Sequence, residues 1–250
     1  MSLHPEPVQH GVRVGHDLLH SVLVHPVQCN CIHFTATVLA MSDAVKSGRR
    51  TYREEQAQAT KERICAAARR LFAVEGYRMT SVAAIAAEAG VAERTVYTAF
   101  GAKREILSAI CEAWLQDAHA QELVAAAVAE PDPMGTIRLA ARFLRALFET
   151  GYDVMVLFDA AAAEDPRTRA MLRAKLEGRN HVQNLIVDSV REHLVLPLPP
   201  AQAIYRALAC VGVYQELVVE SGWTIDQYEH WVLAQLAGQL LGVPADQLAD

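Results

Sequence analysis

A pair of short helical patterns joined at a glycine, between Thr80 and Leu107, constrains this chain more than any other feature. The segment reads TSVAAIAAEAGVAERTVYTAFGAKREIL. Thr80 is expected to cap the first helix, because its hydroxyl can accept hydrogen bonds from the unpaired N–H groups at a helix start. Gly90 is expected to end that helix, since glycine adopts the left-handed conformation at little steric cost. The spacing predicts a tight helix-turn-helix.

The phase of the second helix decides which of its side chains are available to a partner. This helix is expected over about 92–99, with Val96 and Phe100 facing inward. That phase leaves four residues on the outer face, namely Glu93, Arg94, Tyr97 and Thr98.

The chemistry of the outer face suits duplex DNA. Arg94 can bond guanine in the major groove, Thr98 can bond a base or a phosphate, and Tyr97 can reach a phosphate through its hydroxyl. Lys103 opens the next helix and can meet the DNA backbone as a point charge. The helix-turn-glycine-helix pattern alone is equally typical of an ordinary helical hairpin with a polar outer face.

The same residues closely resemble the DNA-binding domain of the TetR family of bacterial transcriptional regulators. The resemblance begins near Thr60, where TKERICAAARRLFAVEGYRMTSV is similar to the family's first helix and its exit. It continues through a segment similar to the family pattern I-A-x-x-A-G-V-[SA]-x-x-T-[VL]-Y-x-x-F-x-x-K-x-x-L. The positions that match are Ile85, Ala86, Ala89, Gly90, Val91, Thr95, Val96, Tyr97, Phe100, Lys103 and Leu107.

Two positions depart from that pattern. Ala92 stands where serine is more usual, so the recognition helix lacks a capping hydroxyl, and Ala99 replaces a common histidine or tyrosine. The resemblance covers about a fifth of the chain by motif and the rest by architecture only. The residues expected at the DNA surface are Thr80, Ser81, Glu93, Arg94, Thr95, Tyr97, Thr98 and Lys103.

Charge divides the chain into a basic part and an acidic part. Residues 41–108 hold 12 Lys or Arg against 8 Asp or Glu, whereas residues 109–250 hold 10 against 19. The net charge of −6 disfavours nonspecific binding of polyanions by the whole molecule. The basic part nevertheless contains the helix-turn-helix. Lys46, Arg49, Arg50 and Arg53 precede the first helix and fit either a basic arm on DNA or a solvated tail.

Residues 1–45 are expected to be a disordered tail, or the product of a start codon placed too early, because Met41 begins a plausible natural start. Cys29 and Cys31 with nearby histidines resemble a metal site, but Cys-x-Cys does not match usual zinc spacings. No apolar run approaches the roughly 18 residues that span a bilayer, so we expect a cytoplasmic protein without membrane contact. No cofactor or metal is expected.

Helical periodicity predicts an all-α fold. A three-helix helix-turn-helix domain is expected over 46–108, and a helical effector-binding and dimerisation domain over 109–250. A long helix over 102–121 should join the two. Proline and glycine breaks place further helices near 134–150, 153–163, 166–194, 200–221 and 224–241.

The family resemblance implies a homodimer formed by the last two helices. Their apolar residues exceed what one side of a domain needs, although they also fit a purely internal core. A two-fold dimer places two recognition helices roughly 34–36 Å apart, one turn of DNA, to read a near-palindrome. The residues expected at this interface are Leu208, Val211, Leu217, Trp231, Leu236 and Leu240.

The resemblance also implies a cavity for an unidentified small-molecule effector between the middle helices. Arg142 and His181 are the polar groups expected to orient a ligand there. The candidate lining residues are Trp114, Arg142, Phe143, Leu147, Met155, Phe158, His181 and Tyr214.

These expectations describe a DNA-binding regulator, and regulators of this family are most often repressors. Binding of an effector is expected to release the protein from its operator. An all-α dimeric binding or structural protein without sequence-specific DNA binding is the alternative. An enzyme is disfavoured, because the sequence has no G-x-S-x-G, H-E-x-x-H, Walker loop or G-x-G-x-x-G motif.

Overall fold

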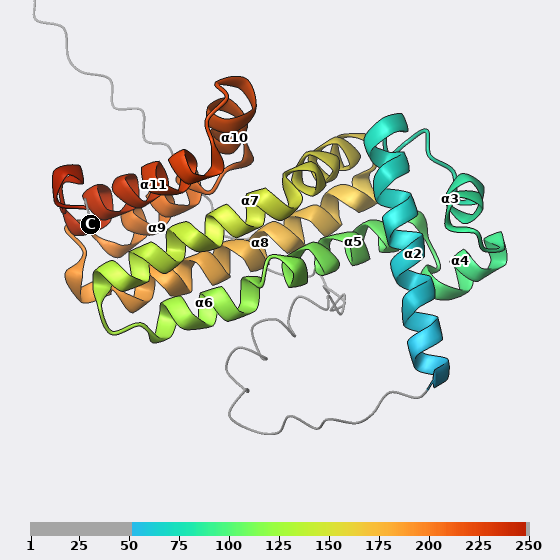
Figure 1. Ribbon diagram of the computed structural model, residues 1–250, viewed down its shortest axis with the longest axis horizontal. Helices are drawn as coiled ribbons and strands as arrows, with labels where there is room; N and C mark the ends of the chain where they lie inside the picture. Colours follow the sequence, from blue (N-terminus) through green and yellow to red (C-terminus); the bar gives the residue numbers. More distant parts are fainter. Residues whose placement is uncertain (1–51, 249–250) are drawn as a thin grey trace, which may run out of the picture.

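The computed structural model describes residues 52–248, and within them every regular element is a helix. The expected tail over 1–45 lies outside these residues. The long helices α7 and α8 run alongside one another along the long axis of the molecule, and α5 and α6 follow one another beside them (Figure 1). α2 crosses one end of this bundle, with α3 and α4 beyond it. The other end is covered by α9, α10 and α11. The all-α architecture expected from periodicity is confirmed.

The N-terminal module comprises α2 (Tyr52–Glu75), α3 (Val82–Ala89) and α4 (Glu93–Phe100). The buried side of α2 carries Ile64, Ala67, Ala68 and Phe72, which share a core with Ile85 and Val96. α2 starts eight residues before Thr60, so Arg53 is helical rather than part of an arm.

The C-terminal bundle begins with α5 (Lys103–Asp117), which leaves the N-terminal module directly. The expected helix over 102–121 is too long, because His119 adopts a left-handed conformation (φ 48°) and starts α6. The remaining helical elements are α6 (Ala120–Ala129), α7 (Pro133–Glu164), α8 (Pro166–Ser189), η1 (Arg191–His193), α9 (Leu198–Leu208), α10 (Val211–Tyr214), η2 (Gln215–Glu220), α11 (Ile225–Leu236), η3 (Ala237–Leu241) and η4 (Ala245–Gln247).

Side-chain caps fix where α7 and α8 begin. The Asp132 carboxylate accepts from the N–H of Gly135 at 2.9 Å, and Pro133 occupies the first turn of α7. The Asp165 carboxylate accepts from the N–H of Thr168 at 2.7 Å, ahead of α8. These caps confirm the breaks predicted at Pro131–Gly135 and Asp165–Pro166.

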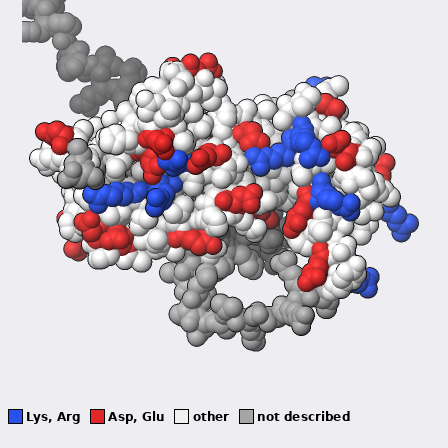
Figure 2. Space-filling view, in the orientation of Figure 1, with Lys and Arg blue, Asp and Glu red and all other residues white. Residues whose placement is uncertain are grey.

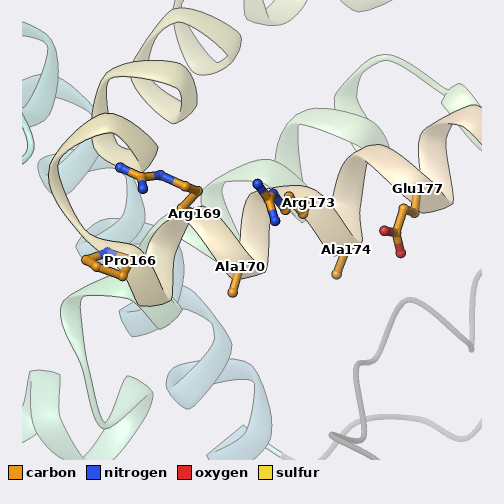
Figure 3. Close-up of a pocket in the computed structure, with 6 residues that line it drawn as sticks. All are labelled: Pro166, Arg169, Ala170, Arg173, Ala174 and Glu177. Carbon is orange, nitrogen blue, oxygen red and sulfur yellow. The ribbon is translucent and has the colours of Figure 1, made fainter. Parts of the chain in front are cut away.

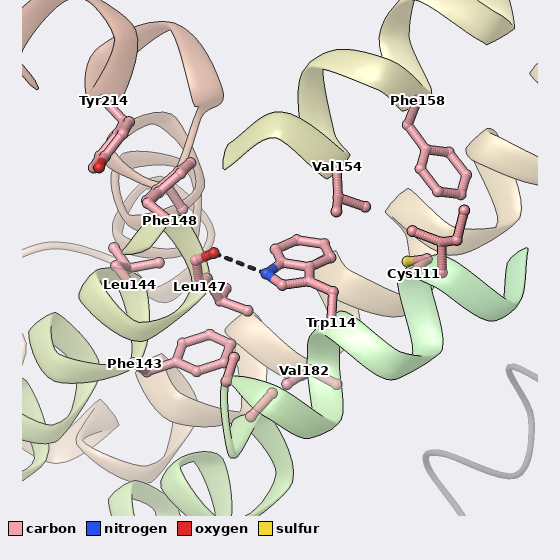
Figure 4. Close-up of a cluster of buried hydrophobic side chains, with 14 of the residues drawn as sticks. Cys111, Trp114, Phe143, Leu144, Leu147, Phe148, Val154, Phe158, Val182 and Tyr214 are labelled. Carbon is pink, nitrogen blue, oxygen red and sulfur yellow. Dashed lines mark hydrogen bonds between the residues drawn. The ribbon is translucent and has the colours of Figure 1, made fainter. Parts of the chain in front are cut away.

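A kink at Gly151 divides α7 into two helical parts. The residue has non-helical angles (φ −160°, ψ 32°), so the two parts correspond to the helices expected over 134–150 and 153–163. Trp114 of α5 fills the bend, and its indole N–H donates to the carbonyl of Leu147 at 2.8 Å (Figure 4). In a regular helix that carbonyl would accept from the N–H of Gly151, four residues on. The indole therefore donates to a helix carbonyl beside the kink.

Candidate nucleic-acid interface

The start of α3 is set by Ser81 and not by Thr80. The Ser81 hydroxyl accepts from the N–H of Ala84 at 3.0 Å, which makes Ser81 the N-cap. Thr80 is buried, and its hydroxyl donates to the carbonyl of Gly76 at 2.9 Å. The expectation that Thr80 caps the helix is wrong by one residue, because the loop turns Thr80 into the core. Thr80 is also covered from any surface partner.

The turn between α3 and α4 has the geometry that Gly90 predicts. Gly90 is left-handed (φ 66°, ψ 39°), and the N–H of Val91 donates to the carbonyl of Ala86 at 3.0 Å. Val96 is 1% exposed, and Phe100 packs partly buried against the same core. The inward face of α4 is therefore anchored as expected.

Anchoring that face turns the opposite face of α4 to solvent. Arg94, Tyr97 and Thr98 are exposed, with half of the Tyr97 surface accessible. Glu93 is also exposed, while Thr95 is half-buried. The Thr98 hydroxyl donates to the carbonyl of Arg94 at 2.8 Å and keeps its acceptor lone pairs. The face is a short polar ridge at the tip of the molecule.

Lys103 is engaged inside the N-terminal module. Its ammonium group donates to the carbonyls of Tyr77 at 2.6 Å, Thr80 at 2.9 Å and Arg78 at 3.4 Å. The same group lies 4.4 Å from the centre of the Tyr77 ring, a cation–π contact. Lys103 therefore ties the start of α5 to the loop between α2 and α3, an arrangement that the motif spacing did not predict.

The surface of the N-terminal module carries both signs of charge (Figure 2). Over residues 52–108 there are 9 Lys or Arg against 7 Asp or Glu, so much of the basic excess of 41–108 comes from Lys46, Arg49 and Arg50. Those three residues lie outside the described part of the chain. An ion pair of 2.9 Å between Arg70 and Glu88 joins α2 to α3 on this surface.

Residues 64–110 match the model of the family described as bacterial regulatory proteins, tetR family. The match covers the second half of α2, the exposed ridge of α4 and the first half of α5. The chain therefore contains the helix-turn-helix domain of that family. No curated protein sequence matches it significantly.

Solved structures of several bacterial regulators share the fold of this chain. The regulator FadR from Bacillus subtilis, in complex with stearoyl-CoA, is 19% identical with a TM-score of 0.58, over 70% of this chain and 96% of that one. NalD, the secondary repressor of the MexAB-OprM multidrug efflux pump in Pseudomonas aeruginosa, is 18% identical with a TM-score of 0.56, over 75% and 98%. A regulator from Saccharomonospora viridis in complex with choline is 16% identical with a TM-score of 0.55, over 74% and 98%.

The apolar residues expected around an effector lie mostly in the core of the C-terminal bundle. Trp114, Phe143, Leu147, Phe158 and Tyr214 are buried, and Met155 is half-buried (Figure 4). The two polar candidates are placed differently. Arg142 and His181 are exposed, because the phase of α7 and α8 turns them away from the bundle, so the expectation that they orient a buried ligand is wrong.

Four other polar side chains have buried atoms in the bundle. Among the described residues, the buried side-chain atoms without a hydrogen-bond partner belong to Arg179, Gln183, Tyr205 and Tyr228. Buried polar groups in folded proteins are usually paired, so this set needs an explanation. The sequence did not predict them, because tyrosine and glutamine in an amphipathic helix are equally typical of the boundary between its buried and exposed faces.

A shallow depression follows the first half of α8 on the surface (Figure 3). Arg169 lies at its edge, but its guanidinium donates to the carbonyls of Ala162 at 2.9 Å and Ala163 at 3.0 Å. That arginine closes the end of α7. The lining residues are Pro166, Arg169, Ala170, Arg173, Ala174 and Glu177.

The expected dimer residues divide into two groups. Leu236 and Leu240 are fully buried within the protomer, so the expectation that they face a partner is wrong. Leu208, Val211, Leu217 and Trp231 keep partly exposed side chains. Val219, between the last two long helices, is about half exposed.

None of the helices in residues 52–248 is long and apolar enough to cross a membrane. Within the same residues, no three His, Cys, Asp or Glu side chains gather in a way that would hold a metal ion.

Proposed function

We propose that this regulator is a repressor that binds a near-palindromic operator as a homodimer and leaves it when a small-molecule effector binds. The observation that carries the proposal is the outer face of α4, where Arg94, Tyr97 and Thr98 are exposed while Val96 is buried. A helix anchored on one side and polar on the other can enter the major groove without rearranging its own module.

Within this proposal, Arg94 reads guanine, and Tyr97 and Thr98 contact phosphates or base edges. Ser81 and Glu93 flank the groove at the starts of α3 and α4, and Thr95 supports the helix from its half-buried position. The DNA-binding domain is assigned to residues 46–108, and the effector and dimer domain to 109–250. Repression is favoured over activation by the fold shared with NalD, a repressor.

The proposed partner surface consists of the end of α9, α10, η2 and the outer side of α11. Leu208, Val211, Leu217 and Trp231 are partly exposed there, next to the exposed Val219. An apolar strip on paired helices fits an isologous contact, in which each protomer supplies the same surface.

The proposed route from effector to DNA runs through the kink of α7. Arg69 of α2 donates to the Asp153 carboxylate at 2.6 and 2.7 Å, and to the carbonyl of Thr150 at 3.1 Å. Both acceptors lie beside Gly151, where Trp114 of α5 fills the bend from the inner side. The N-terminal module is therefore fastened to the part of α7 whose shape depends on the packing of the bundle. A ligand that favours another bend would move α2 and the recognition helix with it.

The second contact between module and bundle is made by Tyr77. Burial raises the pKa of its hydroxyl, and a hydrogen bond with the Thr168 side chain lowers it. Thr168 in turn donates to the capping carboxylate of Asp165 at 2.6 Å. The start of α8 and the kink of α7 thus hold the module at two separate points.

The alternative is an all-α dimeric binding or structural protein without sequence-specific DNA binding, and an enzyme is a more distant candidate. A gel-shift titration with DNA from the gene's own upstream region separates them. We expect a discrete complex that Arg94→Ala weakens and makes less selective, because that arginine is assigned to a base edge. Arg138→Ala is the matched control, since Arg138 is an exposed arginine at the far end of α7. Equal affinity for operator and scrambled DNA would contradict the proposal.

A further inference from the structure

The unpaired polar atoms of the bundle belong to helices that meet at one level of the fold. Arg179 and Gln183 lie one turn apart on the same side of α8, and Gln183 is 1% exposed with both its amide nitrogen and its amide oxygen unpaired. The hydroxyls of Tyr205 in α9 and Tyr228 in α11 are also unpaired, and both side chains are fully buried.

Contacts between α8 and α9 place these groups near one another. The Arg206 guanidinium donates to the side-chain oxygen of Asn184, which fixes the register of the two antiparallel helices. Gln183 and Tyr205 are the neighbours of that bonded pair in sequence, so they lie within about one helical turn of the same level. Burial raises the pKa of the Tyr205 hydroxyl, and the nearby Tyr228 raises it further. Burial and the nearby Tyr214 raise the pKa of the Tyr228 hydroxyl.

Charge around the cluster is positive. The Nη2 group of Arg179 donates to the side-chain oxygen of Asn180 at 3.2 Å, whereas its buried Nε is unpaired. The pKa of Arg179 is lowered chiefly by burial and raised by the nearby Cys210 and Asp159 side chains. Arg206 lies close enough to lower it further. Two guanidinium groups therefore face one carboxylate, and an anion would restore the balance.

We propose that Arg179, Gln183 and Tyr205 form a binding site for a small organic acid, with the carboxylate held by Arg179 and the Gln183 amide, and with a hydroxyl group of the ligand bonded to Tyr205 and Tyr228. The inference rests on the proposed effector function, because it names the chemical class of that effector. A carboxylate accepts from both the guanidinium and the amide, while a ligand hydroxyl can donate to one tyrosine and accept from the other.

The aromatic rings beside the site argue against a cation as the ligand. The rings of Phe148 and Tyr214 stack at 4.7 Å, and Tyr228 meets them edge-on at 5.8 and 5.1 Å. These rings fill one another's faces, so no open aromatic cage remains among them for a quaternary ammonium group. A cation would also add to the positive charge of the two arginines.

The test uses isothermal titration of the full chain with matched probes. The acids are 4-hydroxybenzoate, 4-hydroxyphenylacetate and 4-hydroxycinnamate, each paired with its primary amide, and choline is the cationic probe. We expect at least one acid to bind, with its amide about tenfold weaker or more, because a charge-assisted pair with Arg179 is lost. Failure of all three acids, equal binding of acid and amide, or binding of choline alone would overturn the proposal.

Two variants locate the binding. Tyr205→Phe and Gln183→Met each remove unpaired polar atoms while keeping most of the side-chain volume, and each should weaken the acid about tenfold. Neither should lower the melting temperature of the ligand-free protein, because no bond within the fold is lost. Tyr152→Phe is the control, since Tyr152 is half-buried against the ring of Tyr214 without belonging to the set. Unchanged acid affinity in both variants would overturn the assignment.

Because these titrations contain no DNA, their outcome is independent of the operator. If an acid binds but the chain does not shift upstream DNA, the proposed function is refuted and the binding site stands. If the chain shifts that DNA but binds no acid, the reverse holds.

Discussion

Lys103 shows how a single charge can serve the fold of a DNA-binding module. Its three bonds to the carbonyls of Tyr77, Arg78 and Thr80 join the first turn of α5 to the loop that precedes α3. The motif places a lysine here, and the sequence alone suggested a phosphate contact. The structure adds that the Lys103 ammonium group already donates hydrogen bonds to the loop carbonyls.

Lys103→Met should therefore act mainly on stability. Loop carbonyls left without a donor cost about 1–3 kcal/mol in free energy of unfolding, which urea denaturation measures. Operator affinity should fall, while the slope of log affinity against log salt should change by much less than the value of about one that a lost phosphate contact gives. Lys61→Met, an exposed lysine of α2, is the control for stability. A slope reduced by a full charge would restore the phosphate role.

The sequence predicted individual residues well where a short-range rule decides them. Gly90 and Val96 follow from helix termination and helix phase, and both are placed as expected. Thr80 and Ser81 differ by one residue, which local preference cannot resolve because either hydroxyl can cap. Arg142 and His181 depended on the rotation of long helices in a bundle, and tertiary packing fixes that rotation.

At the scale of elements, the recognition helix α4 begins without a side-chain cap. Ala92 has the extended backbone of an N-cap (φ −70°, ψ 146°) but no group to accept from the first turn. Ala92→Ser should stabilise the module by about 1 kcal/mol, because the serine hydroxyl supplies that acceptor. Chemical denaturation measures the gain. Ala83→Ser, the same change at an exposed position inside α3, should give a small loss. Equal effects at both positions would contradict the capping argument.

The bend of α7 depends on a residue without a side chain at Gly151. A Cβ there would lie 2.1 Å from the Cδ1 and Nε1 atoms of Trp114. Gly151→Ala should destabilise the chain by about 1–3 kcal/mol, because the indole must leave the bend. Differential scanning calorimetry measures the loss.

The matched control for that substitution is Gly212→Ala in α10, where a Cβ meets nothing within 4 Å. It should be neutral or slightly stabilising, since alanine restricts the unfolded chain more than glycine does. A Gly151→Ala loss no larger than that of Gly212→Ala would show that the indole does not depend on the bend. The sequence predicted a break at Gly151, but it could not predict that a tryptophan from α5 would fill it, because that contact joins residues far apart in the chain.

At the scale of the whole molecule, ion pairs made by α7 connect α11, which carries part of the proposed partner surface, to the N-terminal module. Arg145 of α7 bonds Asp226 and, at 2.7 Å, Glu229, both in α11, and also Glu149 at 3.3 Å. Further along the same helix, Asp153 holds Arg69 of α2. α7 therefore touches both the proposed partner surface and the recognition module.

The proposed dimer can be tested at an exposed residue. Val219→Glu should shift sedimentation equilibrium strongly towards the monomer, because a carboxylate would be buried in an apolar contact. The monomer itself should keep its melting temperature, since Val219 is about half exposed. Val128→Glu places the same charge on an exposed valine of α6 and should leave the dimer intact. A dimer that tolerates Val219→Glu would move the interface elsewhere.

Coupling between the two ends predicts a further outcome for Asp153→Asn. Loss of the ion pair should speed hydrogen exchange in α2 and lower operator affinity, while the unfolding free energy falls by no more than about 1 kcal/mol because the pair is partly exposed. Glu88→Gln, which breaks the Arg70 pair inside the N-terminal module, is the control and should not affect exchange at the kink. Unaltered exchange and affinity in Asp153→Asn would exclude this route.

The packing of Trp114 against Gly151 has a consequence for building hybrid regulators. Trp114 lies on α5, which leaves the N-terminal module, whereas the bend that it fills belongs to α7 of the C-terminal bundle. A hybrid that joins this N-terminal module to the C-terminal bundle of another regulator would contain Trp114 without the bend at Gly151, or the bend without Trp114. Cassette exchange should therefore succeed only when α5, the bend of α7 and the Arg69–Asp153 pair are transplanted together.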